Sequence, residues 1–242
     1  MTPAVPAIPT GIRLYAVGDI HGRADLLQAL LVLIEDDARP HAAIAKRLIY
    51  LGDYVDRGPD SKAVIDLVLD AAPPGFEVVT LMGNHEEMMH RFLDDLSVAR
   101  TWMMNGGDAT LESYGVAAPS MFSGSGAFRR AQEEFVARLP ARHREFLVRL
   151  QVSHGAGDYL FVHAGVRPGV PLDRQTTDDL LWIRDEFLYS EADFGKVVVH
   201  GHSISLDAEF RPNRIGIDTG AYKSSQLSCL VLQDSSRDLL ST

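Results

Sequence analysis

The amino-acid sequence predicts an α/β fold with buried sheets, and two observations carry this prediction. Short runs of β-branched and other apolar residues alternate along the chain with segments whose apolar residues recur at helical spacing. Of the 242 residues, 46% are hydrophobic and 23% are charged. That balance is ordinary for a protein with a packed core and far from the composition of a disordered chain.

Seven apolar runs are predicted to be strands, because each is short, rich in β-branched or large apolar residues and bounded by turn-forming residues. They are residues 12–17, 47–51, 77–82, 159–162, 196–199, 214–217 and 227–232. Four segments carry apolar residues three and four positions apart, which predicts amphipathic helices that cover the sheets. They are residues 24–38, 61–72, 86–96 and about 129–150.

We expect one domain over residues 11–242, since no repeat, low-complexity block or linker interrupts this pattern. Residues 97–126 contain NGG, SYG and SGSG and are expected to form an irregular insertion over one face, near the site and a suspect for substrate selection. Residues 1–10 hold three prolines and no basic residue. They are expected to form a flexible tail, neither a secretion signal nor a membrane anchor.

The charge balance argues against two classes of partner. Lys and Arg number 23 against 33 Asp and Glu, a net charge of −10, which disfavours a nucleic-acid backbone or an anionic membrane surface. No apolar stretch reaches the roughly 20 residues of a spanning helix. Cys229 is the single cysteine, so it has no disulfide partner within the chain. We expect it to be buried in a strand of a cytoplasmic protein.

Five of the apolar runs end at Asp, Asn or His, the residue types that bind borderline metals and move protons. The sequences at these ends are GDIHG, GDYVDRG, GNHE, VHAG and HGHS. Ligands of open α/β sheets bind outside the carboxyl ends of strands, so one geometry would bring all five ends together. Each motif alone could be a turn or a helix cap. Caps and turns, however, do not require histidine at four of five strand ends, and the set predicts a chemical site.

The succession GDIHG, GDYVDRG and GNHE, extended by the later histidines, resembles the calcineurin-like metallophosphoesterases. Within them it is similar to the phosphoprotein phosphatases, and above all to their compact bacterial and phage types. The match runs from Gly18 to His202. The resemblance implies a two-sheet β-sandwich flanked by helices, with a dinuclear metal site at the carboxyl ends of strands.

The resemblance also implies a ligand set for two divalent ions. Asp19 and His21 would bind the first ion, and Asp53 would bridge both. Asn84, His163 and His202 would complete the second site. Carboxylate, imidazole and amide-oxygen ligands together favour Mn²⁺, with Fe or Zn²⁺ as further candidates, over a calcium cage. Two such ions would turn a bridging water into a hydroxide that attacks phosphorus in line, without a phosphoenzyme.

Four more residues match family roles. His85 resembles the general acid that protonates the leaving group, and Asp56 would hold its ring in the productive tautomer. Arg57 and Arg184 resemble the arginines that clamp the phosphate, a task that suits the planar guanidinium. For Arg184 the match is only to a short W-x-R context, so an ordinary surface arginine remains the alternative.

These roles predict a metal-dependent phosphomonoester hydrolase whose partner is a phosphorylated protein or peptide. The DRG of GDYVDRG favours a serine/threonine protein phosphatase, with phosphotyrosine acceptance left open. A symmetrical dinucleoside tetraphosphatase is the alternative enzyme. A non-catalytic metal-bearing binding module is disfavoured, because a scaffold has no need of an acid such as His85.

Several other residues have a structural as well as a chemical interpretation. His200 is either a partner of a metal ligand or simply the end of a strand, and Asp218 either supports a ligand histidine or forms a turn. Trp102 either lines a substrate cleft or anchors the insertion, and Glu86 favours the first turn of a helix. The remaining histidines are expected to be solvated surface residues. They are His41, His90, His143 and His154.

Overall fold

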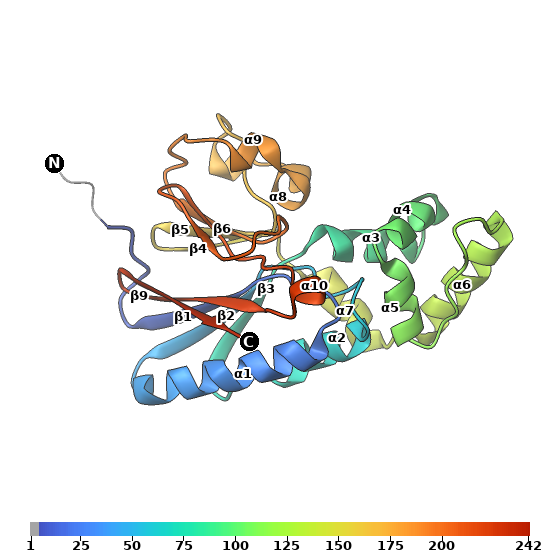
Figure 1. The fold of residues 1–242 in the computed structure, drawn as a ribbon, viewed down its shortest axis with the longest axis horizontal. Coiled ribbons are helices and arrows are strands. Elements are labelled where there is room, and N and C mark those ends of the chain that lie inside the picture. The colour runs from blue at the N-terminus through green and yellow to red at the C-terminus, as the bar shows by residue number, and fades with distance from the viewer. Residues whose placement is uncertain (1–4) are drawn as a thin grey trace.

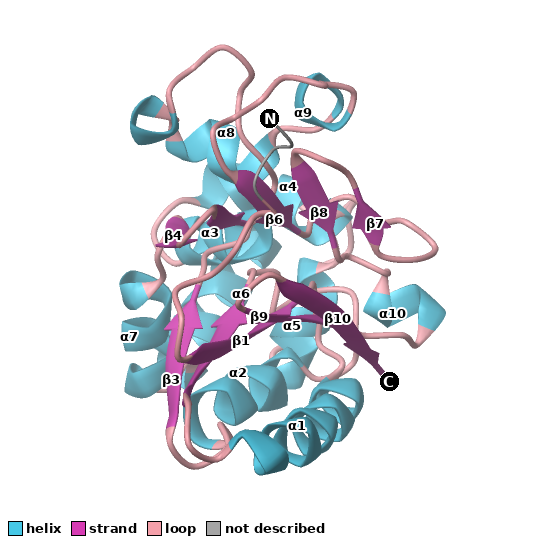
Figure 2. Cartoon of the chain, turned by 90° about the vertical axis from the view of Figure 1, so that its left-hand side faces the viewer, coloured by secondary structure: helices cyan, strands magenta, loops and turns pink. Residues whose placement is uncertain are grey.

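A computed structural model, which describes residues 5–242, places two five-stranded sheets face to face with helices on both outer faces (Figure 1). Figure 2 shows the two sheets edge-on as separate layers. The expected α/β sandwich is therefore confirmed.

The first sheet combines the N-terminal strands with the last two of the chain. Its strands are β1 (Ile12–Val17), β2 (Ala45–Tyr50), β3 (Phe76–Thr80), β9 (Ser228–Gln233) and β10 (Ser236–Ser241). Their order is β10-β9-β1-β2-β3; the pairs β1–β2 and β2–β3 are parallel, while β9 runs antiparallel to both β1 and β10. The carboxyl ends of β1, β2 and β3 consequently lie at one edge.

The second sheet is built from the middle of the chain. Its strands are β4 (Ser153–Ala156), β5 (Tyr159–Val162), β6 (Val197–His200), β7 (Glu209–Phe210) and β8 (Arg214–Gly216). Their order is β4-β5-β6-β8-β7, with β5, β6 and β8 parallel and the two outer strands antiparallel. Parallel β5 and β6 again deliver two motif-bearing loops to the same edge.

The helices form the two outer layers and one lateral group. They are α1 (Ala24–Ala38), α2 (Ser61–Asp70), α3 (Asn84–Phe92), α4 (Ala99–Met104), α5 (Gly107–Ser113), α6 (Ser125–Arg138), α7 (Ala141–Arg149), α8 (Thr177–Trp182), α9 (Asp185–Leu188) and α10 (Ala221–Ser224). Short 3₁₀ turns span Arg39–His41, Leu96–Val98 and Leu172–Arg174. In Figure 1, α4, α5 and α6 extend beyond the sheets as a helical lobe at one end. No helix of the described residues is long and apolar enough to cross a membrane.

Three hydrophobic clusters hold these layers together, and burial of apolar area is the main force behind each. Alternate residues of both sheets, such as Leu14, Ile49 and Val199, form the core between them. A larger cluster joins the outer face of the first sheet to α1–α7, and a smaller one joins the second sheet to α8 and α9. Cys229 is buried, as expected for a strand residue.

Two segments differ from the sequence-based expectations. Residues 97–126, expected to be irregular, contain α4 and α5, because apolar residues such as Trp102 and Leu111 are buried at helical spacing. Residues 1–4 of the expected flexible tail lie outside the described residues, but Ile8 is buried against the sheets and donates its backbone N–H to Asp234. One apolar side chain thus fixes the later part of the tail.

His143 also differs from expectation, since it is buried rather than solvated. Its Nδ1 accepts from the Tyr114 hydroxyl at 2.8 Å, and its Nε2 donates to Asp66 at 3.0 Å. Together these bonds tie α7 to α2 and to the end of α5. The other three histidines of that group, His41, His90 and His154, are half-buried.

The buried His143 predicts a loss of stability on acidification. Burial lowers the pKa of His143, with Arg142 and Lys62 acting the same way, and outweighs the opposing attraction of Asp66. The unfolded chain therefore binds a proton near pH 6.5 that the folded protein does not, so the fold loses stability as pH falls below about 6.5. Melting temperatures between about pH 7.5 and about pH 5.5 should fall less steeply for a His143→Gln variant than for the wild type. Parallel curves would contradict this account.

Candidate metal centre and active site

The expected site residues follow strands of both sheets and meet at one edge of the sandwich. Asp19 and His21 follow β1, Asp53 follows β2, and Asn84 begins α3 directly after β3. The second sheet contributes His163 after β5 and His202 after β6. The parallel arrangement of β1–β3 and of β5–β6 is the reason that these distant sequence positions come together.

Asp53 lies at the centre of two overlapping groups of potential metal ligands. Ligand atoms of His21, Asp53 and His85 lie within 4.8 Å of one another, as do those of Asp53, His163 and His202. The Asp53 carboxylate is 3.5 Å from His21 Nε2 and 3.4 Å from His163 Nε2. A carboxylate shared by two clusters is the arrangement expected of a bridging ligand.

The hydrogen bonds of two histidines leave a nitrogen that carries no proton facing this centre. His21 Nδ1 donates to the Val55 carbonyl at 2.8 Å, and His163 Nδ1 donates to the Leu51 carbonyl at 3.0 Å. In a neutral ring the other nitrogen then carries only a lone pair. His163 Nε2 nevertheless lies 2.9 Å from Asn84 Oδ1 and 3.2 Å from His202 Nδ1, both of which can be acceptors. Acceptors converging without a proton between them favour a cation at this place.

The electrostatics of the site also fit divalent metals. Burial lowers the pKa of His21 to about 3 and that of His202 to about 2, so both rings are neutral, the form that binds metal. Burial together with Asp218 and Asp53 raises the pKa of the Asp19 carboxyl. A nearby cation would compensate this cost of burying negative charge.

Asp19 and His202 each hold one atom that points to the same conclusion. Asp19 Oδ1 and His202 Nε2 are buried and have no hydrogen-bond partner in the described part of the chain. The other oxygen of Asp19 accepts the His202 backbone N–H at 2.9 Å, which joins the loops after β1 and β6. Buried polar atoms are rarely left unpaired in native proteins. The residues present therefore fit a two-metal centre, with Asp19 and His202 offering free ligand atoms.

His85, Asp56 and Arg57 form a connected group beside this centre. His85 Nδ1 lies 2.6 Å from Asp56 Oδ2, and both side chains are buried. Burial lowers the pKa of His85, but Asp53 and Asp56 outweigh it, so the pKa lies above its ordinary value. Arg57 Nη1 and Nη2 lie 2.8 Å from His21 Nε2 and 3.0 Å from His85 Nε2. The guanidinium thus faces the space between the two rings.

Arg184 and two aromatic residues lie at the opening of the site. Arg184 is exposed, and its Nη1 donates to the His202 carbonyl at 3.2 Å. The Arg57 guanidinium lies over the Tyr222 ring at 5.0 Å, and that ring also meets His21 edge-on. Trp182 lies 6.4 Å from the His202 ring. Tyr222 was missed from the sequence, because AYKSS carries no recognisable motif around it.

Five residues of the site have a strained backbone conformation. Of the described residues other than glycine, those with positive φ include His21 (45°), Asp53 (51°), Asp56 (73°), Arg57 (69°) and His202 (60°). Such conformations cost of order 1 kcal/mol or more each and persist where surrounding contacts hold them. Their concentration here marks the site independently of the residue types.

Glu86 is one source of those contacts, although its sequence context suggested only a favourable first helical turn. Its fully buried carboxylate accepts four backbone N–H groups at 2.8 to 3.2 Å, from Asp53, Tyr54, Val55 and Gly83. The glutamate of GNHE therefore fixes the backbone that presents Asp53. No spacing rule reveals such a role, because its partners are main-chain atoms.

A Glu86→Gln variant should lose both stability and metal affinity. The new amide group would turn N–H donors toward backbone N–H donors in a fully buried position. We expect a loss of about 2–4 kcal/mol in the free energy of unfolding and a roughly 10- to 100-fold weaker metal affinity. Urea unfolding and titration against a competing chelator measure the two quantities. Glu112→Gln, at an exposed position on α5, is the control. If the two variants had the same stability and the same metal affinity, the proposed role of Glu86 would be wrong.

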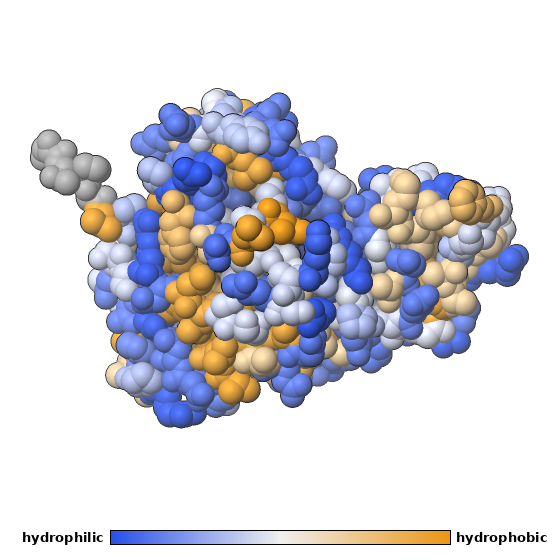
Figure 3. Space-filling view, viewed as in Figure 1, coloured by the Kyte–Doolittle hydropathy of each residue, from blue (hydrophilic) through white to orange (hydrophobic). Residues whose placement is uncertain are grey.

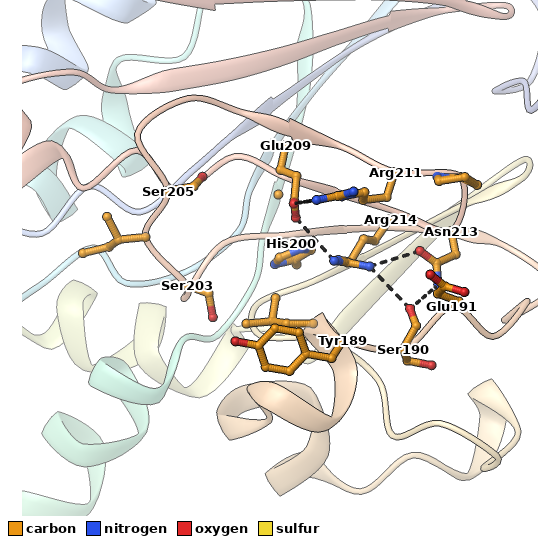
Figure 4. A pocket seen from close by; sticks show the side chains of 14 residues that line it. Tyr189, Ser190, Glu191, His200, Ser203, Ser205, Glu209, Arg211, Asn213 and Arg214 are labelled. Atoms are coloured by element: carbon orange, nitrogen blue, oxygen red, sulfur yellow. Dashed lines mark hydrogen bonds and ion pairs between the residues drawn. The ribbon is translucent and has the colours of Figure 1, made fainter.

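A cavity of about 670 Å³ adjoins the loop that carries His202 (Figure 4). Its walls come from the end of α9, the residues after His202 and the β7–β8 hairpin. His200 lies on one wall with Nδ1 bonded to its neighbour's carbonyl, and its Nε2 and the Nε of Arg214 are buried without a partner in residues 5–242. His200 is thus not bonded to a metal ligand. Asp218 accepts the Gly220 backbone N–H, which corresponds to the turn role.

The surface in Figure 3 is mainly hydrophilic, with small hydrophobic groups over the first sheet and between the two layers. Two exposed apolar side chains, Tyr189 and Ile204, also line the cavity, and the exposed Trp182 lies beside His202. Concave sites bordered by apolar groups with a few convergent polar atoms are the usual form of ligand sites.

The fold and the site together define a metallophosphoesterase, a hydrolase of phosphate esters or anhydrides. The chain belongs to the calcineurin-like phosphoesterase family, whose model matches residues 12–223. This confirms the resemblance drawn from GDIHG, GDYVDRG and GNHE. The residues fit divalent metals, the cofactors of this family.

Among curated proteins, the chain is similar to a symmetrical bis(5'-nucleosyl)-tetraphosphatase of Acidovorax sp. (strain JS42), with 34% identity over 155 residues, covering 64% of this chain and 44% of the relative. It is also 33% identical over 96 residues to serine/threonine-protein phosphatase 1 of Salmonella typhimurium, covering 39% of this chain and 38% of that protein. The matches span less than half the length of either relative. A crystal structure of a protein provisionally named a diadenosine tetraphosphatase shares the fold, with a TM-score of 0.64, 22% identity and coverage of 99% of this chain and 95% of that one.

Proposed function

We propose that the protein is a metal-dependent serine/threonine protein phosphatase that releases phosphate by direct hydrolysis. The observation that carries the proposal is the buried Asp56–His85 pair beside a two-cluster ligand set, with Arg57 reaching into the same space. The exposed Arg184 at the opening supports a substrate whose phosphate projects from a larger molecule. The likeness to the Salmonella phosphatase supports the same substrate class.

The proposed metal ligands are Asp19, His21 and Asp53 for one ion and Asp53, Asn84, His163 and His202 for the other. When bound, Mn²⁺, Fe or Zn²⁺ would supply Lewis-acid stabilisation of the phosphoryl oxygens and a nucleophilic water at neutral pH. We propose that both ions are Mn²⁺.

The remaining steps belong to the side chains. Arg57 and Arg184 would donate hydrogen bonds to the non-bridging phosphoryl oxygens. These bonds would hold the phosphorus in position for in-line attack. His85 Nε2 would give its proton to the oxygen of the leaving serine or threonine as the bond to phosphorus breaks. Asp56 accepts the Nδ1–H and so holds the ring with Nε2 toward the substrate.

A second candidate is hydrolysis of symmetrical dinucleoside tetraphosphates. The Acidovorax relative carries that name, and the adjoining cavity offers room for part of a substrate larger than a phosphorylated side chain.

Hydrolysis by metal-stripped protein, with and without added Mn²⁺, tests both candidates. It is followed as inorganic phosphate for the phosphate monoesters and as ADP for diadenosine tetraphosphate, because symmetrical cleavage of the dinucleotide releases no phosphate. The substrates are phosphoserine, phosphothreonine and phosphotyrosine peptides, p-nitrophenyl phosphate and diadenosine tetraphosphate. Turnover that requires Mn²⁺ and is fastest on the phosphoserine or phosphothreonine peptide supports the proposal, whereas preference for the dinucleotide supports the second candidate. No turnover with two metals bound per chain would overturn both and favour a metal-bearing binding module.

A further inference from the structure

We propose that the α4–α5 segment positions the proton donor, with Trp102 and Thr110 holding the Asp56 carboxylate so that only one of its oxygens faces His85. The inference rests on the proposed role of His85 as general acid. Trp102 and Thr110 touch neither substrate nor metal in this scheme and are positioning residues. With Gly106 and Gly107 they form what we call the Asp56 clamp.

The Asp56 carboxylate is completely buried and accepts hydrogen bonds from three side chains. His85 Nδ1 lies 2.6 Å from Oδ2, and Trp102 Nε1 donates to Oδ2 at 2.9 Å and to Oδ1 at 3.1 Å. Thr110 Oγ1 donates to Oδ1 at 2.6 Å. Two of the three donors therefore come from the clamp, and they fix the rotation of the carboxylate about its Cβ–Cγ bond.

The Thr110 bond to the carboxylate fixes the direction of a second bond, between Thr110 and Ser61. The Asp56 backbone N–H donates to both Thr110 Oγ1 at 2.9 Å and Ser61 Oγ at 3.0 Å, and the two hydroxyls lie 2.9 Å apart. Since the single Thr110 proton goes to the carboxylate, Ser61 must donate to Thr110. Thr110 thus holds both the backbone and the side chain of Asp56, a residue with φ of 73°.

The two glycines of the NGG sequence explain how α4 and α5 come this close. The Gly106 carbonyl accepts the Arg57 backbone N–H at 3.1 Å, and a Cβ on Gly106 would meet that nitrogen at 2.7 Å. A Cβ on Gly107 would meet the Trp102 indole at 2.6 Å. Glycine at both positions therefore lets the backbone after Asp56 and the Trp102 ring lie directly on the α4–α5 turn.

Trp102 also connects the clamp to the core of the helical lobe. Its buried ring packs against Phe92 and Phe135, with ring centroids 4.7 and 5.8 Å away. The lobe core therefore determines where the indole N–H points. A structural anchor needs only the ring, whereas the bonds of Nε1 to both Asp56 oxygens serve the carboxylate, and this difference makes the two roles separable.

The test compares two substrates that differ in their need for a proton donor. p-Nitrophenolate leaves readily without protonation, while phenolate requires a proton as its bond to phosphorus breaks. The variants are Thr110→Val, which removes the hydroxyl at nearly constant volume, and Trp102→Phe, which removes the N–H and keeps an aromatic ring. Thr110→Ser restores a hydroxyl, and Thr101→Val makes the same substitution at an exposed position of α4.

We expect Thr110→Val and Trp102→Phe to lower kcat by about 10- to 100-fold on phenyl phosphate and by less than about 3-fold on p-nitrophenyl phosphate. The loss on phenyl phosphate would be a part of the roughly 10²- to 10⁴-fold rate enhancement that a general acid supplies. KM and the metal content should stay near the wild-type values, and Thr110→Ser and Thr101→Val should behave as the wild type. The ratio of the two kcat values, measured on one preparation, is independent of the fraction of correctly folded enzyme.

A His85→Asn variant measured in the same way separates the two claims. If His85→Asn acts selectively on phenyl phosphate while Thr110→Val and Trp102→Phe lower both substrates equally, the clamp has only a structural role and the inference is wrong. If His85→Asn shows no selectivity, the proposed acid is wrong instead.

Discussion

Replacing His85 by Asn should lower kcat for a phosphoserine peptide by about 10²- to 10⁴-fold, the usual contribution of a general acid, while both metals stay bound. The physical reason is the chemistry of the leaving group, because a serine alkoxide is a far poorer leaving group than the alcohol. The amide N–H of Asn can replace the Nδ1–H of His85, which lies 2.6 Å from the Asp56 carboxylate, as the hydrogen-bond donor to Asp56. The amide cannot, however, deliver a proton to the substrate. The measurement is steady-state kinetics together with metal content by mass spectrometry.

His90→Asn is the matched control for this variant. His90 lies on the same helix α3, is half-buried and makes no side-chain hydrogen bond among the described residues. It should therefore keep full activity. Loss of metal together with activity in His85→Asn would mean that His85 acts as a ligand, as its place in the His21–Asp53 group would allow.

Replacing Asp53 by Asn should remove both metals and lower kcat by roughly 10³-fold or more. The reason is that bound metals supply several kcal/mol of transition-state stabilisation. Asp53 is the one residue shared by both ligand groups. Three histidines outweigh the effect of its burial and hold the pKa of its carboxyl well below the ordinary value, so the group is ionised. Asn keeps the shape but removes the charge and one ligand oxygen.

Asp60→Asn provides the control in the same loop. Asp60 caps α2 by accepting the Ala63 backbone N–H, and Asn caps helices equally well. Metal content and activity should therefore be unchanged in Asp60→Asn. If Asp53→Asn retained both metals, the bridging assignment would be wrong, even if activity fell.

The parts of this molecule that the sequence predicted share one property: their signal is local. The run 24–38 was predicted as a helix from its periodicity and forms α1 with the same bounds. Strands 12–17 and 159–162 likewise agree, because buried parallel strands are apolar throughout. The polar residues at the ends of these strands converge because parallel strands share an edge.

The missed parts depend on contacts distant in sequence. β10 was not predicted because it is an edge strand with polar residues at four of its six positions, and β7 has only two residues. Glu86 and Thr110 hold backbone N–H groups of the loop after β2, and no residue pattern encodes such bonds. His143 looked like one more residue of a charged helix until the fold placed Tyr114 and Asp66 on either side of it.

The division of the proposed metal ligands between the two sheets sets an order of events during biosynthesis. Asp19, Asp53 and Asn84 are synthesised early, but His163 and His202 emerge only with β5 and β6 of the second sheet. A nascent or truncated chain that stops before His202 would therefore lack part of the centre, however well its first helices and strands had formed. In a refolding experiment, tight metal uptake would accordingly report the docking of one sheet on the other rather than the formation of either.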